Sequence, residues 1–199
     1  MRKALTYVLI FILVGCTNKG LIITKSNNKI IKPQYSIVIP PEQGWSIYRD
    51  DDNPDAAVFQ KSINSGLCSM RFSTNRAGHE SMKTWTAKQL ADAYRNTEKQ
   101  NMINMGVMTG QHELKDVEYT TETIKGKTYY IMNYVTLHKK HKQHNYKQKS
   151  SLYLHFPQER TIRDFILALY SELYPVNEPL ANSPRNEFMT TLKSLEVRQ

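Results

Sequence analysis

Apolar and polar residues alternate along four short segments in the first third of the chain. Prolines, glycines and acidic residues separate the segments. Alternation with a period of two is typical of β-strands that bury one face, and turn residues between such runs indicate hairpins. The sequence therefore predicts an antiparallel meander of four short strands, at 35–40, 45–49, 57–62 and 67–74.

The next pattern has the period of a helix. Between Met82 and Asn101 the apolar residues recur near one face, and Ser81 is a residue type that caps helix N-termini. The sequence predicts an amphipathic helix there, with Lys88 and Arg95 on its polar face.

Three longer strand patterns follow, at 112–123, 128–138 and 145–156. In the second, Tyr129 and Ile131 face one way, whereas Tyr130 and Met132 face the other. A strand that is apolar on both faces is usually covered on both faces. We therefore expect a sheet sandwiched between helices.

The last part of the chain contains one ambiguous segment and one clear helix. Residues 161–174 fit both a helical and an alternating pattern, and we favour a strand because it suits a hairpin return. Ser183 and Pro184 then form a helix start, followed by apolar residues at helical spacing: Phe188, Leu192 and Leu195.

The N-terminus has the pattern of a secretory signal peptide. Arg2 and Lys3 precede about a dozen mostly apolar residues, too few for a spanning helix, which needs about twenty. The four residues Leu13, Val14, Gly15 and Cys16 resemble the lipobox of bacterial lipoproteins. That resemblance implies cleavage before Cys16 and attachment of lipid to its sulfur.

The lipobox also predicts the organisation and location of the chain. We expect a signal peptide at 1–15, a lipidated flexible tether at 16–33 and a single globular α+β domain at 34–199. Thr17 stands where lipoproteins retained on the inner membrane carry aspartate, so the resemblance implies the outer membrane, on the periplasmic side.

The order of these elements resembles the PsbP-like α/β/α sandwich family, to which DcrB-type bacterial lipoproteins belong. The resemblance covers roughly residues 34–197. It implies a mostly antiparallel sheet with helices packed on it, and a protein-binding or accessory role at a membrane. It supplies no catalytic residues and no cofactor.

Histidines at 138, 141 and 144 are the most chemically suggestive group. Three imidazoles within seven residues are potential ligands for zinc or copper. In an extended segment, however, His141 points opposite to His138 and His144, and the neighbouring lysines repel a cation. We favour a solvated basic hairpin loop over a metal site.

Positive charge dominates the chain. Removing Arg2 and Lys3 with the signal peptide leaves 25 basic and 18 acidic residues, a balance of +7. Such a balance favours anionic lipid or acidic glycan as a partner, and no nucleic-acid motif is present. The predicted contacts are the lysines of the basic loop: Lys139, Lys140, Lys142, Lys147 and Lys149.

Two other groups have structural interpretations. Cys68 shares one strand face with Met70 and Phe72, and polar residues alternate with these three, which predicts a core position. Since the lipobox resemblance implies that Cys16 carries lipid, we expect no disulfide partner for Cys68. The acidic run at 49–55 is typical of a turn; as a calcium loop it would have Ala56 in the place of the required glycine.

The expected function is that of a lipid-anchored envelope protein that binds an envelope protein partner without catalysis. No nucleophile elbow or zinc-protease motif is present. The alternative is a metal-binding protein or hydrolase built on the histidine-rich hairpin at 138–144.

Overall fold

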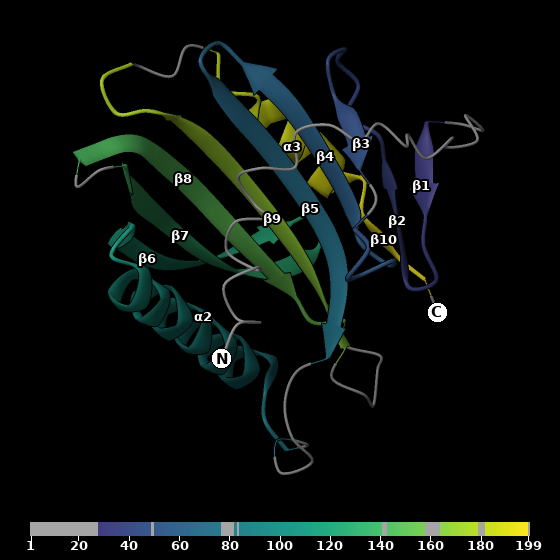
Figure 1. Ribbon diagram of the computed structural model, residues 1–199. Coiled ribbons are helices and arrows are strands. Elements are labelled where there is room, and N and C mark those ends of the chain that lie inside the picture. Colours follow the sequence, from purple (N-terminus) through teal and green to yellow (C-terminus); the bar gives the residue numbers. More distant parts are fainter. Residues whose placement is uncertain are drawn as a thin grey trace.

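The computed structural model describes residues 28–48, 50–76, 82, 84–140, 143–157, 164–178 and 182–198. Within them a seven-stranded antiparallel sheet runs in the order β3-β4-β5-β9-β8-β7-β6 (Figure 1). Its strands are β3 (Ser46–Tyr48), β4 (Ala57–Ile63), β5 (Gly66–Arg76), β6 (His112–Ile124), β7 (Lys127–Lys140), β8 (Gln143–His155) and β9 (Asp164–Pro175).

A three-stranded sheet and two helices complete the described fold. The small sheet has the order β1-β2-β10, with β1 (Lys29–Ile31), β2 (Tyr35–Val38) and β10 (Glu196–Val197). The helices are α2 (Ala87–Thr109) and α3 (Arg185–Lys193). The predicted fold class, a mostly antiparallel sheet with helices packed on it, is confirmed.

Two meanders meet at the centre of the main sheet. Strands β3 to β5 form one and β6 to β9 the other, and β5 pairs with β9 from Leu67 opposite Leu173 to Arg76 opposite Asp164. The described part of the ambiguous segment at 161–174 is therefore a strand, as favoured. Its apolar residues form a nearly continuous run from Phe165 to Tyr170, because β9 lies between β5 and β8 and is covered on both faces.

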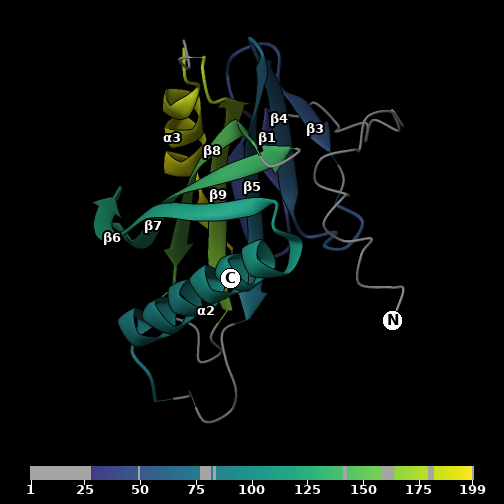
Figure 2. The same cartoon turned by 60° about the vertical axis from the view of Figure 1, so that its left-hand side comes forward.

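The two faces of the main sheet bury separate cores. Tyr129 and Ile131 of β7 belong to the core under α3 and the small sheet, whereas Met132 and Tyr134 belong to the core under α2. Figure 2 shows the two helices on opposite sides of β7 and β8. The prediction of a sheet between helices is confirmed.

The core under α3 is rich in aromatic rings. Phe188 is fully buried, and its ring centroid lies 5.0 Å from Tyr170, 5.3 Å from Tyr153 and 6.0 Å from Phe72. Cys68 is also fully buried in this core and forms no disulfide. Its predicted role as a core residue is confirmed.

The predicted four-stranded meander is wrong in its first member. Strand β2 does not pair with β3; it pairs with β1 on one side and with β10 on the other, so that Glu196 lies opposite Ser36. Strand β1 lies inside the segment expected to be tether, 16–33. The folded domain thus includes Lys29, because the backbone of β1 finds hydrogen-bond partners on β2.

The predicted helix is displaced toward the C-terminus. It begins after Thr86, which caps it together with Gln89 in a capping box, and it ends at Gly110 with φ of 62°. Ser81, the expected cap, lies outside the described residues. Gly106 lets the helix end approach β6, because a Cβ there would lie 2.7 Å from the His112 carbonyl oxygen.

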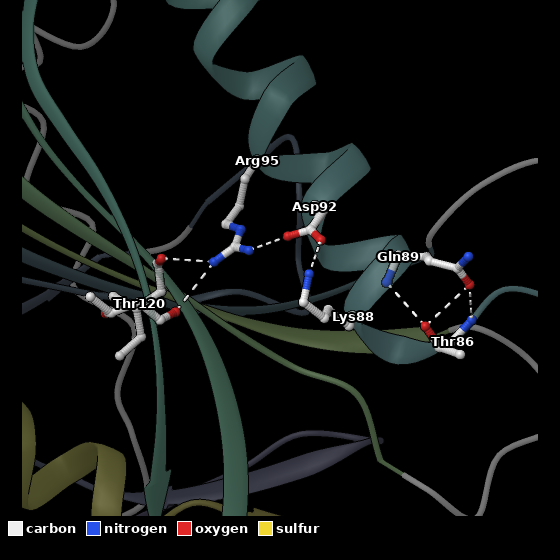
Figure 3. A network of polar contacts seen from close by, with 7 residues as sticks. Thr86, Lys88, Gln89, Asp92, Arg95 and Thr120 are labelled. Atoms are coloured by element: carbon white, nitrogen blue, oxygen red, sulfur yellow. Dashed lines mark hydrogen bonds and ion pairs between the residues drawn. The ribbon is translucent and has the colours of Figure 1, made fainter.

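Arg95 was predicted to be exposed and is 5% exposed. Its Nη1 donates to the carbonyl oxygens of Ile131 at 3.0 Å and Thr120 at 3.3 Å, and its Nη2 pairs with Asp92 (Figure 3). The guanidinium also lies 4.8 Å from the Tyr119 ring centroid. Helical periodicity misplaces this residue because the side chain is long enough to carry its charge to strand carbonyls under the helix.

We expect Arg95→Lys to lower the free energy of unfolding by about 2–3 kcal/mol, because a lysine ammonium lacks the planar fork that reaches both carbonyl oxygens and Asp92. Chemical denaturation of the purified protein measures this change. Lys88→Ala is the matched control, since Lys88 pairs with the same Asp92 but its side chain is 71% exposed. That variant should stay within about 0.5 kcal/mol of wild type. Equal stability of Arg95→Lys and wild type would contradict the role given to the guanidinium.

Candidate functional site

The histidine- and lysine-rich segment forms part of the β7–β8 hairpin. Strand pairing continues to Lys139 opposite His144 and Lys140 opposite Gln143. The expectation of a loop is therefore wrong for these residues, because the two backbones pair almost to the tip. His141 and Lys142 lie outside the described residues, and the side chains of Lys140 and His144 are likewise not described.

His138 is engaged by two neighbours. Its Nδ1 lies 3.0 Å from Nδ1 of His112, and its Nε2 lies 2.9 Å from Oε1 of Gln148. Because an amide oxygen only accepts, Nε2 of His138 carries a proton; neutral His138 then accepts at Nδ1 from His112. Gln148 in turn donates to Ser150 at 3.3 Å. The result is a chain of polar contacts under the C-terminal part of α2.

Sequence reasoning missed His112. It lies opposite His138 in the pairing of β6 with β7, and the two rings are perpendicular with centroids 4.8 Å apart. The periodicity of the sequence does not indicate this pairing, because almost all of β6 and β7 lies between the two histidines along the chain. Only the β6–β7 register brings them together.

Burial lowers the pKa of both histidines. For His112 burial is the cause; for His138 burial dominates, His112 adds to it and the hydrogen bond with Gln148 opposes it. Neutral imidazoles at neutral pH are consistent with the hydrogen bond between them. Each ring then has one donor and one acceptor nitrogen.

Of the three histidines in the alternative metal site, only His138 has a described side chain, because His141 and the side chain of His144 lie outside the described part of the chain. The described residues contain no group of three or more histidine, cysteine, aspartate or glutamate side chains that would hold a metal ion. His138 uses both of its nitrogens in hydrogen bonds.

Three of the predicted lysines have described side chains, Lys139 on β7 and Lys147 and Lys149 on β8. The Lys139 ammonium is 3.9 Å from Glu113, and Lys149 is exposed, with its ammonium 6.0 Å from the Tyr174 ring centroid. Lys147 is half-buried. The backbone of β7 meets the link between α2 and β6 here, because the Lys139 amide donates to the Gln111 carbonyl at 2.7 Å.

The C-terminal half of α2 exposes apolar side chains next to this link. Val107 is 80% exposed and Met108 84% exposed. Ile103 and Met105 are exposed to a smaller extent. These residues lie beyond the predicted helix end at Asn101, so their exposure on a helix was not predicted.

A polar cavity of about 410 Å³ lies between the end of β4 and the start of α3. On its wall Lys61 lies 2.9 Å from Oε1 of Glu187, and Trp45 donates its indole N–H to Oε2 of the same carboxylate. Burial alone would raise the pKa of Glu187, but these hydrogen bonds outweigh it and lower the pKa. The charges of Lys61 and Glu187 therefore neutralise each other, and their contact holds α3 against β4.

Glu172, Tyr170 and Ser183 form a second polar cluster beside the cavity. Tyr170 donates to Oε1 of Glu172 at 2.5 Å, and Ser183 donates to the same oxygen. Cys68 lies opposite Glu172 across β5 and β9, and burial raises the pKa of its thiol to about 12. A protonated, fully buried thiol is a poor nucleophile, so this cysteine is structural.

The acidic run forms a turn, as predicted. Oδ1 of Asp50 accepts from the backbone amides of Asn53 at 3.1 Å and Asp52 at 3.2 Å, and its other oxygen pairs with Arg71. Such bonds are typical of Asx turns.

Cys16 and the four lipobox residues lie outside the described residues. In the part of the chain that the structure describes, none of the helices is both long and apolar enough to cross a membrane.

Comparison with solved structures finds the solution structure of cyanobacterial PsbP from Synechocystis. The two chains are 15% identical with a TM-score of 0.47, and the match covers 94% of this chain and 99% of that one. No protein-family model matches the chain, and no curated protein does. The fold class rests on the strand pairings and helix packing described above.

We expect the stability of the protein to fall as the pH drops below about 6.5. The folded state depresses the pKa of His112 and His138, so the unfolded chain, with a histidine pKa near 6.5, binds more protons there. Their contribution is present above pH 6.5 and is lost at lower pH. Thermal melts between pH 7.5 and 5 of wild type and His138→Gln measure it, and the variant should lose less stability over this range.

His155→Gln is the control for that measurement. Burial also lowers the pKa of His155, which bonds to the Thr128 carbonyl at 3.0 Å, away from the histidine pair. In this variant the part of the pH dependence that belongs to His112 and His138 should remain. Parallel curves for wild type and His138→Gln would rule out a contribution from the pair.

Proposed function

We propose that the protein is a lipid-anchored lipoprotein of the cell envelope that binds a partner at the membrane surface without catalysing a reaction. Cys16 carries the lipid, the chain faces the periplasm from the outer membrane, and the domain is the binding part. The proposal is supported by the lipobox residues and by one observation on the folded domain.

That observation is the pairing of an apolar helix end with a basic hairpin. Val107 and Met108 are largely exposed, and the β7–β8 hairpin beside them is rich in lysine. Apolar side chains that a monomer leaves in water are typical of a surface that binds a partner. The lysines favour a partner with negative charge.

The tether length suits such a role. From Cys16 to the start of β1 at Lys29 there are 13 residues, which span at most roughly 45 Å when extended. The domain therefore stays close to the bilayer while it keeps freedom to turn toward a partner. An envelope protein, anionic lipid and acidic glycan all fit these properties.

We expect wild-type protein from bacterial cells to incorporate labelled fatty acid, because the lipobox directs acylation of Cys16. Cys16→Ser should incorporate none. Mass spectrometry of the wild-type N-terminal peptide should show residues 1–15 removed and lipid on Cys16. The matched control is Cys68→Ser, which should label like wild type because Cys68 is fully buried. Fatty acid retained in Cys16→Ser would refute the anchor.

The binding role is tested separately by crosslinking in intact cells. A photo-reactive residue in place of Met108 should form a defined adduct with one partner of the envelope. The same residue in place of Thr123, which is exposed at the opposite end of β6, is the control and should not form that adduct. Identical adduct patterns from both positions would refute a binding role for the helix end.

A further inference from the structure

The cavity of about 410 Å³ beside α3 is a feature that the proposed function does not use. It lies between the end of β4, the β4–β5 turn and the segment that leads into α3. Its volume is in the range of small-molecule sites, roughly 300–1,000 Å³. The cavity is therefore large enough for a small ligand and too small for a folded partner.

Polar and charged residues dominate the lining of this cavity. Of the ten residues that line it, eight are polar or charged, and the two apolar ones, Ile63 and Pro184, are buried. A polar group that loses water without gaining a hydrogen bond costs free energy. The lining therefore favours a hydrophilic ligand that replaces the hydrogen bonds of water.

The ionic groups of the lining are already paired with one another. The Lys61 ammonium lies 2.9 Å from Glu187 and 3.4 Å from Glu42. Burial alone would lower the pKa of Lys61, but these two contacts outweigh it and raise the pKa, so the ammonium stays charged. Among the described lining residues, one ammonium and two carboxylates give a charge of −1. Because the lysine is already paired, the cavity disfavours anionic ligands.

Three asparagines from separate segments supply a neutral part of the lining. Asn64 lies in the β4–β5 turn, Asn182 precedes α3, and Asn186 is in the first turn of α3. All three are exposed, and the described residues offer their side-chain amides no hydrogen-bond partner. A carboxamide has one acceptor oxygen and two donor hydrogens, so each amide is able to donate to a ligand and to accept from it.

We propose that this cavity binds a neutral saccharide. A sugar hydroxyl both donates and accepts, so neighbouring hydroxyls on a ring match amides that also do both. An ammonium ligand only donates and would leave the amide N–H groups without acceptors. An anionic ligand would meet a paired lysine and an additional carboxylate. A free sugar and the end of a neutral glycan chain present the same hydroxyls to the cavity.

The inference goes beyond the proposed function and does not rest on it. The cavity lies at the start of α3, and Figure 2 shows α3 and α2 on opposite sides of β7 and β8. A failure to bind sugar would leave the lipid anchor and the exposed end of α2 untouched. Failure of the anchor would likewise leave the cavity unchanged.

The test is a titration of the full-length protein in a detergent without a sugar headgroup, followed by the fluorescence of Trp45. The chain contains two tryptophans, so Trp85→Phe leaves Trp45 as the emitter. The Trp45 indole donates to Glu187 on the cavity wall, and a bound ligand should therefore change its emission. Calorimetry on the same samples detects binding that leaves the emission unchanged. The probes are glucose, N-acetylglucosamine, cellobiose and chitobiose, and the charged controls are glucuronate and glucosamine.

We expect at least one neutral sugar to bind with a Kd below about 10 mM, and both charged controls to bind more weakly. Asn182→Gly and Asn186→Ala should each weaken binding about five-fold, because each removes a hydrogen bond to the ligand. Glycine suits position 182, where φ is 62°. The matched control is Asn28→Gly, which removes an exposed asparagine side chain at φ of 50° outside the cavity and should bind like wild type.

Absence of binding by every neutral sugar would overturn the inference. So would a charged control that binds as tightly as the best neutral sugar, or unchanged affinity in both cavity variants. Sedimentation with insoluble chitin and cellulose distinguishes the two sources of ligand. Protein that pellets with either polymer binds glycan chains, whereas protein that binds soluble sugar and stays in solution takes free sugar.

Discussion

Burial on both faces of the central strands is the constraint on which this structure depends. Strands β7, β8 and β9 carry apolar side chains on both sides, so neither face tolerates water. Helix α2 covers one face; helix α3 and the small sheet cover the other. Along the chain, α2 stands between the two meanders and α3 comes after both.

Each helix is also fastened by one buried charge. Arg95 carries its charge from α2 to the carbonyl oxygens of β6 and β7. Glu187 carries its charge from α3 to Lys61 of β4 and to Trp45. A buried charge is tolerated only when it is paired and hydrogen-bonded, so these contacts fix the position of each helix on the sheet. Apolar packing alone would allow the helices to shift along it.

The same architecture places the exposed apolar end of α2 beside the β7–β8 hairpin. Antiparallel pairing of β6 with β7 puts the start of β6 beside the β7–β8 hairpin, and α2 ends just before β6 begins. The exposed apolar turns of α2 thereby lie near Lys139, whereas Lys147 and Lys149 share the opposite face of β8 with Tyr153. The histidine pair lies at the same place, because His112 is the first residue of β6 and His138 is near the end of β7. Because burial lowers the pKa of both histidines, their protonation at low pH destabilises the folded state.

Local patterns in the sequence determined most of the elements. Alternation predicted β4 to β9, helical spacing and the Ser183–Pro184 start predicted α3, and the two-faced pattern of β7 predicted the layers. The sequence also predicted that Cys68 is a core residue, because it shares one strand face with Met70 and Phe72. These features depend on residues near one another in the chain.

Tertiary structure alone decided the pairing of β2 with β1 and β10, the burial of Arg95 and the meeting of His112 with His138. It also extended α2 to Thr109, where Gly106 allows close contact with β6. Strand β10 is far from β2 in sequence, as Ile131 is from Arg95 and His138 from His112. Periodicity records only whether a position is buried, not what covers it. The apolar end of α2 is also a result of tertiary structure, because Val107 and Met108 lie beyond the helix end that periodicity predicted.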